Sequence, residues 1–129
     1  MRKLSVPTWE KKLDELVKEI VFLRDKDCVT CPIWYDIKPL THHGSNVMQP
    51  GHFIKRGCKT VKWDLRNVYK QCKTCNYLHN HYPEVFANYV LSVLDVAGFE
   101  DLVYEGYKVS PSIKAWQLEE FYNKLKKLC

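Results

Sequence analysis

Apolar residues near the start of the chain recur at the spacing of an α-helix. We predict an N-terminal helix over residues 7–25, since Pro7 and Thr8 stand where a helix can begin. Such a stripe usually faces a protein core, and its narrowness is also typical of a dimer seam, so both interpretations stay open. The apolar positions alternate in steps of four and three, which places them on one face of the helix: Trp9, Leu13, Leu16, Ile20 and Leu23.

Two further segments have helical patterns. Pro83 suits the first turn of a helix and Gly98 its C-cap. A last helix begins near Ser110 or Pro111 and ends in Lys124, Lys126 and Lys127, whose charges complement the helix dipole. The expected buried positions of the first are Val85, Phe86, Tyr89, Val90, Val93 and Leu94, and the apolar positions of the second are Trp116, Leu118, Phe121, Tyr122 and Leu125.

Between residues 28 and 57 the pattern is irregular. Prolines and glycines interrupt it often enough to exclude long helices, so loops and short strands should fill it. Residues 48–55 and 60–64 are short and β-prone, and they predict a hairpin with its turn at residues 56–59. The chain is therefore expected to form an α+β fold.

The bulk composition sets the class of protein. With 129 residues, 46% of them hydrophobic, one modest core in a single domain is the expectation. The start of the chain is charged and amphipathic, and no apolar run approaches the roughly 20 residues that span a bilayer. We therefore expect a cytoplasmic protein without a membrane partner. The net charge of +5 favours a polyanionic partner but is weak support for one.

Four of the six cysteines have the spacing of a metal site. Cys28 with Cys31, and Cys72 with Cys75, form two CxxC pairs. Four thiolates complete a tetrahedral zinc shell with no open position, which indicates a structural role. Redox pairs are the alternative, but neither pair follows the buried strand that a thioredoxin-like motif needs.

Metal binding at this site should be coupled to folding. Four thiols without a metal would repel one another when ionised, so chelation should unfold the centre of the protein. Cys58 and Cys129 have no partner at ligand spacing, and we expect free thiols there.

Three polar residues stand in a recognisable order around the second CxxC pair. His52 lies on the first predicted strand, Asn67 comes five residues before Cys72, and Asn76 directly follows Cys75. A lone histidine would usually be structural, so the spacing of all three supports the interpretation. Together they resemble the ββα-metal (His-Me finger, HNH) nuclease motif with a zinc knuckle.

One family resembles the chain more closely over residues 15–100. The segments FLRD at 22–25, GHF at 51–53 and NVYKQCKTCN at 67–76 are similar to those of the phage NinG (Rap) recombination proteins. The order of cysteines, histidine and asparagine is also similar to that of phage endonuclease VII. This resemblance implies a structure-specific endonuclease that cuts branched recombination intermediates, such as Holliday junctions and D-loops, in a bacterial host cell.

The chemistry of phosphodiester hydrolysis explains these residue types. The reaction needs an activated water and neutralisation of charge on the phosphate and the leaving oxygen. His52 is suited by type to take a proton from water near neutral pH. The resemblance implies that Asn67 fixes the loop and the histidine, and that Asn76 gives an oxygen ligand to a catalytic Mg²⁺ or Mn²⁺ ion.

One departure from the family affects the catalytic ion. Related sequences commonly carry an aspartate ligand shortly before the histidine, whereas this chain has Gln49 and Gly51 there. A neutral amide binds Mg²⁺ less well than a carboxylate. The replacement could be His42, His43, Asp64 or His79, the last being one helical turn beyond Asn76, and the sequence does not choose among them. His81, before a proline, is expected in a loop or cap.

Basic residues surround the proposed site, with Trp63 and Tyr69 among them, whereas acidic residues concentrate in the N-terminal helix and after Glu84. Contacts with phosphates would position DNA without reading its bases. Junctions are cut in pairs, so a homodimer through the first or last helix is a reasonable hypothesis. The predicted DNA-binding residues are Lys55, Arg56, Lys59, Lys62, Arg66, Lys70 and Lys73.

The sequence thus predicts one domain over residues 1–129. It comprises the N-terminal helix at 7–25, a zinc-knuckle HNH core at 28–82 and C-terminal helices at 83–129. Two rival functions stay open: a non-catalytic zinc module that binds DNA, and an HNH nuclease of the restriction or homing type that cuts linear duplex at a defined sequence.

Overall fold

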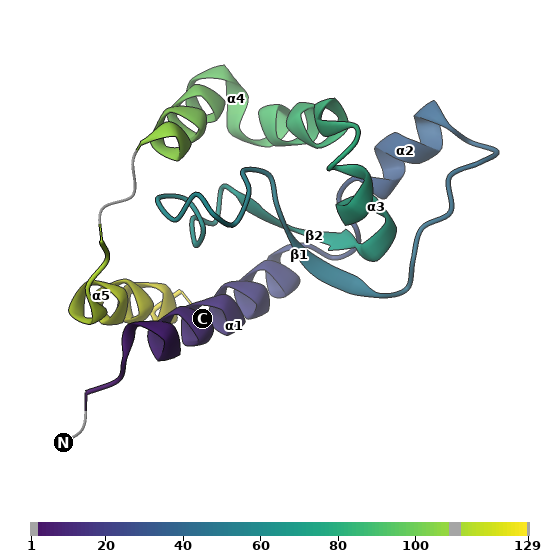
Figure 1. Ribbon diagram of the computed structural model, residues 1–129. Coiled ribbons are helices and arrows are strands. Elements are labelled where there is room, and N and C mark those ends of the chain that lie inside the picture. The colour runs from purple at the N-terminus through teal and green to yellow at the C-terminus, as the bar shows by residue number, and fades with distance from the viewer. Residues whose placement is uncertain (1–2, 109–111, 129) are drawn as a thin grey trace.

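The structure, a computed structural model, describes residues 3–108 and 112–128. Figure 1 shows two helices, α1 and α5, side by side at one end, a two-stranded sheet in the middle, and α2 and α3 at the other end. The elements are α1 (Val6–Arg24), α2 (Cys31–Ile37), β1 (Met48–His52), β2 (Val68–Cys72), α3 (Lys73–Leu78), α4 (Pro83–Tyr107) and α5 (Ala115–Lys126).

The first helix begins almost where the sequence predicts. Ser5 is its N-cap, and its hydroxyl accepts a hydrogen bond from the Thr8 N–H. The apolar stripe packs within the chain against α5, so it faces a core. At the C-terminal end of the helix the predicted stripe is wrong, because Leu23 is 77% exposed, while Val17 and Val21 are buried in its place.

The sheet differs from the predicted hairpin. Its second strand is Val68–Cys72, and residues 60–64 form turns instead. In the antiparallel register, Met48 pairs with Cys72 and His52 pairs with Val68. Two apolar side chains of this segment are buried in different clusters. Val61 lies in the cluster around α4, and Trp63 lies in the cluster around α1. Burial in two different places overrides strand propensity here.

Both faces of the sheet are covered. Successive residues on a strand point to opposite sides, and Val68 accordingly packs with α1 while Tyr69 packs with Phe86 and Val90 of α4. The sheet is therefore held between α1 and α4, which fixes the end of β1 where His52 lies.

Helix α4 does not end at Gly98, so the prediction of a C-cap there is wrong. The chain breaks its helical path at Asp95, where φ is 61° and ψ is −180°, and a second helical segment follows to Tyr107. The Asp95 carboxylate accepts a hydrogen bond from the Gly98 N–H, as an N-cap does. Val93, predicted to be buried, is 52% exposed.

Three further findings concern α2 and α5. The short helix α2 lies between the cysteine pairs, where the sequence predicts only loops and strands, and Cys31 and Pro32 open it. The last helix begins at Ala115 rather than near Ser110 or Pro111, which lie outside the described residues, as does Cys129. Trp116, one of the apolar positions of this helix, is 60% exposed.

At the level of class, the expected fold is confirmed: helices surround a small two-stranded sheet and a cluster of four cysteines. In the described part of the chain, no helix is long and apolar enough to cross a membrane.

Candidate metal centre and adjoining pocket

Four cysteine side chains meet where the sheet joins α2 and α3. Cys72 ends β2 and also caps α3, while Cys75 lies in the first turn of α3. Cys28 precedes α2 and Cys31 opens it. All four Sγ atoms lie within 4.8 Å of one another, with Cys31 Sγ at 3.6 Å from Cys72 Sγ and 3.5 Å from Cys75 Sγ. The structure thus brings together the predicted metal ligands.

The donor set fits a structural zinc ion. A tetrahedral site with Zn–S bonds of about 2.3 Å requires sulfur atoms about 3.8 Å apart, which the observed spacings approach. Three of the four cysteines, Cys28, Cys72 and Cys75, are buried. A closed four-sulfur shell offers no position for water or substrate, so a metal here would hold the fold rather than catalyse a reaction.

The thiols do not all ionise readily without a metal. Hydrogen bonding from the Cys75 thiol lowers the pKa of Cys28 to about 4, and burial raises the pKa of Cys31 to about 12. The same contact with Cys28 raises the pKa of Cys75. Four thiolates therefore require a cation among them, which couples metal binding to loss of protons.

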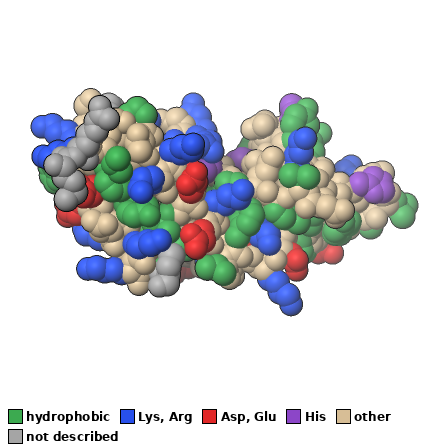
Figure 2. Space-filling model, turned by 90° about the horizontal axis from the view of Figure 1, so that it is seen from below, with side chains coloured by type: hydrophobic (Ala, Val, Ile, Leu, Met, Phe, Trp, Pro, Cys, Tyr) green, Lys and Arg blue, Asp and Glu red, His purple; other side chains and the backbone are tan. Residues whose placement is uncertain are grey.

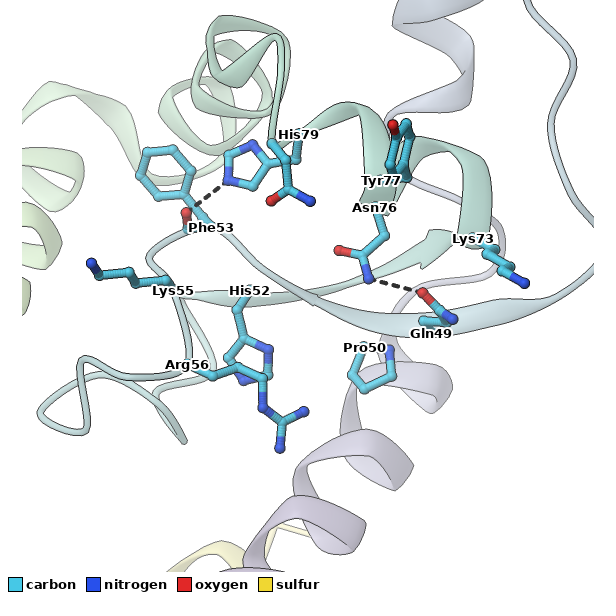
Figure 3. Close-up of a pocket in the computed structure, with 11 residues that line it drawn as sticks. Gln49, Pro50, His52, Phe53, Lys55, Arg56, Lys73, Asn76, Tyr77 and His79 are labelled. Atoms are coloured by element: carbon cyan, nitrogen blue, oxygen red, sulfur yellow. Dashed lines mark hydrogen bonds between the residues drawn. The ribbon is translucent and has the colours of Figure 1, made fainter.

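Next to the cysteine cluster lies a polar pocket of about 560 Å³. The strand β1, the loop after it and the outer face of α3 form its walls (Figure 3). Because Asn76 follows Cys75 directly, the helix that carries two predicted metal ligands also presents a side chain to this pocket. Its lining residues are Gln49, Pro50, His52, Phe53, Lys55, Arg56, Lys73, Asn76, Tyr77, His79 and Asn80.

The ring of His52 is fixed in one orientation. Its Nε2 lies 2.9 Å from the Lys62 carbonyl oxygen, which can only accept, so Nε2 carries the proton and Nδ1 keeps its lone pair. Burial lowers the pKa of His52, and the charge of Arg56 acts in the same direction, against the Lys62 hydrogen bond and the charge of Asp14. The imidazole is therefore neutral near pH 7 and available as a base.

Asn67 holds the loop between the strands. It is fully buried, and its Oδ1 accepts a hydrogen bond from the Ile54 N–H at 2.7 Å. Its Nδ2 donates to the carbonyl oxygens of Ile54 and Val61, at 3.0 and 3.2 Å. One side chain thus ties Ile54 to Val61, the residue directly before Lys62, whose carbonyl is the partner of His52.

Gln49 faces Asn76 across the pocket. The Asn76 amide donates to Gln49 Oε1 at 2.9 Å (Figure 3). This contact leaves Asn76 Oδ1 free to accept or to ligate. In the sequence, Gln49 stands out only as a departure from the family, and the structure identifies it as the side chain opposite Asn76.

The other candidates for the catalytic ion lie elsewhere or are engaged. His42 is next to Cys31 and Cys75, His43 is exposed, Asp64 pairs with Arg66, and none of the three lines the pocket. His79 lines it, but its Nε2 donates to the Phe53 carbonyl oxygen at 2.9 Å. The ring of His79 packs against Phe86, with centroids 4.8 Å apart. His79 as a ligand stays a prediction.

Most of the predicted DNA-binding residues are engaged within the chain. Arg56 and Lys62 contact Asp14 of α1, at 3.1 and 3.7 Å, and Lys59 contacts Glu10 at 2.9 Å. Basic and acidic residues that lie apart along the sequence thus meet in space, because α1 lies against the basic loop. Figure 2 likewise shows acidic side chains among basic ones on the face it presents. Asp14 also borders His52 from the side of α1, a neighbour that no local motif indicated.

The remaining basic residues fall into two groups. Arg66 pairs with Asp64 and Asp101, and Lys70 donates to the Lys26 carbonyl. Lys55 and Lys73 line the pocket, and within the described ranges they make no ion pair. The pocket thus keeps an uncompensated positive rim.

Gly51 leaves space for the side chain of Gln71 from the neighbouring strand. A Cβ there would lie 2.7 Å from Cδ of Gln71, a buried side chain whose Nε2 donates to the Thr30 hydroxyl at 3.0 Å. Position 51 therefore has no room for a side chain beside the cysteine cluster.

Gly51→Ala is expected to lower the free energy of unfolding by about 1–3 kcal/mol, the usual effect of overpacking a core. Chemical denaturation of the zinc-loaded protein measures it. Gly57→Ala is the matched control, because a Cβ at Gly57 meets nothing within 4 Å. Equal stability of the two variants would contradict the close approach at Gly51.

Comparison of the chain with family models, curated proteins and solved structures gave no match. The resemblance to the NinG family stays a prediction. A functional proposal therefore rests on the geometry of the four-cysteine centre and of the pocket beside it.

Proposed function

We propose that this chain is a metal-dependent endonuclease of the HNH type that hydrolyses phosphodiester bonds in DNA. The observation that carries the proposal is the orientation of His52: its Nε2–H is held by a carbonyl, and its ring lines the same pocket as Asn76 and Gln49. A neutral base that lines the same pocket as a pair of amide oxygens suits attack of water on a phosphate.

Each residue has a defined part in the proposed reaction. His52 takes the proton of the attacking water on Nδ1, while the Lys62 carbonyl holds the ring and stabilises its charged form. Asn67 keeps that carbonyl in place through the loop. Lys55 and Lys73 stand at the pocket without an ion-pair partner among the described residues and would bind the phosphates on either side of the scissile bond.

The pocket also fits a hydrated divalent cation. Asn76 Oδ1 and Gln49 Oε1 are the oxygens that would hold it, in a polar space large enough for the waters that Mg²⁺ retains. When bound, such an ion neutralises charge on the phosphate and on the leaving oxygen. The four-cysteine centre would hold zinc separately and position α3.

A non-catalytic DNA-binding module is the second candidate. Among the described residues, no carboxylate lines the pocket, and Gln49 and Asn76 already satisfy one another by a hydrogen bond. A weak cation site would leave a surface that binds DNA without cutting it.

The test is cleavage of a labelled four-way junction and of a linear duplex of the same sequences, in Mg²⁺ and in Mn²⁺. We expect metal-dependent cuts near the branch point, and a His52→Ala preparation controls for contaminating nucleases. Binding without cleavage in either metal would favour the module. Cuts at one sequence in the linear duplex would favour a restriction or homing nuclease.

Sedimentation of the protein with and without the junction would test the proposed homodimer.

Gln49→Asp is expected to increase Mg²⁺-dependent cleavage, because a carboxylate binds Mg²⁺ more strongly than an amide. The measurement is the Mg²⁺ concentration that gives half-maximal cleavage, which should fall. The control is Asn80→Asp, which adds the same charge at an exposed position on the pocket rim. Gln71→Asp would not serve, because Gln71 is buried. An unchanged metal requirement in Gln49→Asp would argue against Gln49 as a ligand.

A further inference from the structure

His42 is buried in a loop whose other residues are mostly exposed. The residue is 7% exposed, whereas Thr41, His43 and Gly44 beside it are all exposed. Its ring stacks on Trp34 of α2, with centroids 5.9 Å apart and an interplanar angle of 16°. The ring of Tyr35 makes a T-shaped contact with it, with centroids 4.9 Å apart. Two aromatic rings therefore hold the imidazole in place.

The held ring directs one nitrogen at the cysteine cluster. His42 Nε2 lies 3.5 Å from Cys31 Sγ and 3.7 Å from Cys75 Sγ. These are distances at which an N–H group donates to sulfur. The loop itself lies against the cluster, since a Cβ at Gly44 would be 3.0 Å from Cys31 Sγ.

We propose that His42 is a positioning residue of the metal centre, which donates its Nε2–H to the metal-bound thiolates of Cys31 and Cys75. Zinc with four thiolates has a net charge of −2, and burying that charge is costly unless N–H groups offset it. The backbone N–H of Cys75 already donates to Cys72 Sγ at 3.4 Å. His42 supplies the corresponding donor on the side of Cys31.

His42 acts from outside the ligand shell. The donors that all lie within 4.8 Å of one another are the four sulfurs, and the imidazole nitrogen contacts only two of them. Partners that hydrogen-bond to metal ligands orient them and tune their basicity. The inference does not depend on the proposed nuclease activity, because it concerns only the four-cysteine centre.

Two variants separate the hydrogen bond from the packing. His42→Phe keeps an aromatic ring against Trp34 and removes the donor, whereas His42→Gln keeps a terminal N–H at similar reach and removes the ring. We expect zinc affinity, measured by competition with a chelating indicator, to fall roughly 10- to 100-fold in His42→Phe. His42→Gln should recover most of the loss. His43→Ala, at an exposed neighbour, should bind zinc as the unmodified protein does.

Cobalt(II) in place of zinc gives a second readout that packing alone does not change. Loss of an N–H donor raises the energy of the sulfur lone pairs, so the sulfur-to-cobalt charge-transfer band of His42→Phe should move to lower energy. The d–d bands should stay those of four-sulfur ligation. Zinc affinity in His42→Phe equal to that of the unmodified protein would overturn the proposal. Cobalt d–d bands showing that His42→Phe had lost a nitrogen ligand would also overturn the proposal.

Discussion

Cys75→Ser is expected to unfold the centre of the protein, whereas Cys58→Ser should leave it folded. Cys75 is 1% exposed and lies among the other three sulfurs, so its loss breaks a complete zinc shell inside the core. Cys58 is only half-buried and packs at the edge of the cluster around α4. The two variants remove the same chemical group, but only one removes a metal ligand.

The size of the effect depends on the small core around the cysteines. Structural zinc contributes on the order of 10–16 kcal/mol to the folding of zinc-finger peptides, while a whole domain is stable by about 5–15 kcal/mol. The buried members of the cluster are three of the cysteines, Trp34 and Val85, with a few partly buried side chains packed against them. Hydrophobic burial in so small a cluster does not compensate for a lost ligand, so α2, α3 and the β2 end should lose order together.

Hydrogen exchange in zinc buffer measures this expectation element by element. Amides of α3 should lose protection in Cys75→Ser, and chelation of the unmodified protein should give the same pattern. The helix pair α1 and α5 has its own apolar cluster and should keep more of its protection. Full protection of α3 in Cys75→Ser, or in the chelated protein, would contradict a structural metal.

His52→Ala is expected to lower cleavage of the preferred DNA substrate by about 10²- to 10⁴-fold, the usual contribution of a general base. The substitution removes Nδ1 and leaves the Lys62 carbonyl without its donor. DNA binding should change little, because Lys55 and Lys73 keep their places at the rim. Single-turnover rates at saturating protein separate the two effects. His43→Ala, on the exposed loop, is the control.

The dependence of cleavage on pH gives an independent check of His52. A base works in its neutral form, and burial lowers the pKa of His52, so the neutral form persists to lower pH than for an exposed histidine. As the pH is lowered through neutrality, protonation of His52 should therefore not slow cleavage. The rate should decrease only below about pH 6.5, the ordinary pKa of histidine. A cleavage rate that already decreases above about pH 7 as the pH is lowered would argue against His52 as the base. So would an active His52→Ala variant.

The features that the sequence predicted correctly depend on local spacing. The start of α1 is set by a capping serine, a proline and a helical repeat over a few turns. The cysteine cluster is predictable from two short CxxC spacings, since each pair needs only a tight turn. The contact between Gln49 and Asn76 was not predicted, and it arises because β1 pairs with β2, which leads straight into α3.

The features that were missed depend on contacts between distant segments. Residues 60–64 look like a strand, but Asn67 and the burial of Val61 and Trp63 fold them into turns. The ion pairs of the basic loop with Asp14 and Glu10 join residues more than 40 positions apart. No short segment of the sequence contains both partners of such a pair. The pattern of charges along the chain therefore does not indicate which basic side chains are free.

The adjacency of Cys75 and Asn76 on α3 limits how the gene can vary. Each residue added to a helix rotates the later residues by about 100° around its axis. One inserted codon between the two positions would thus point the Asn76 amide away from Gln49 while leaving both CxxC pairs intact. Such a protein would still bind its metal and fold, but the Asn76 amide would no longer line the pocket. Length changes in this short helix are therefore expected to be more harmful than most substitutions on its surface.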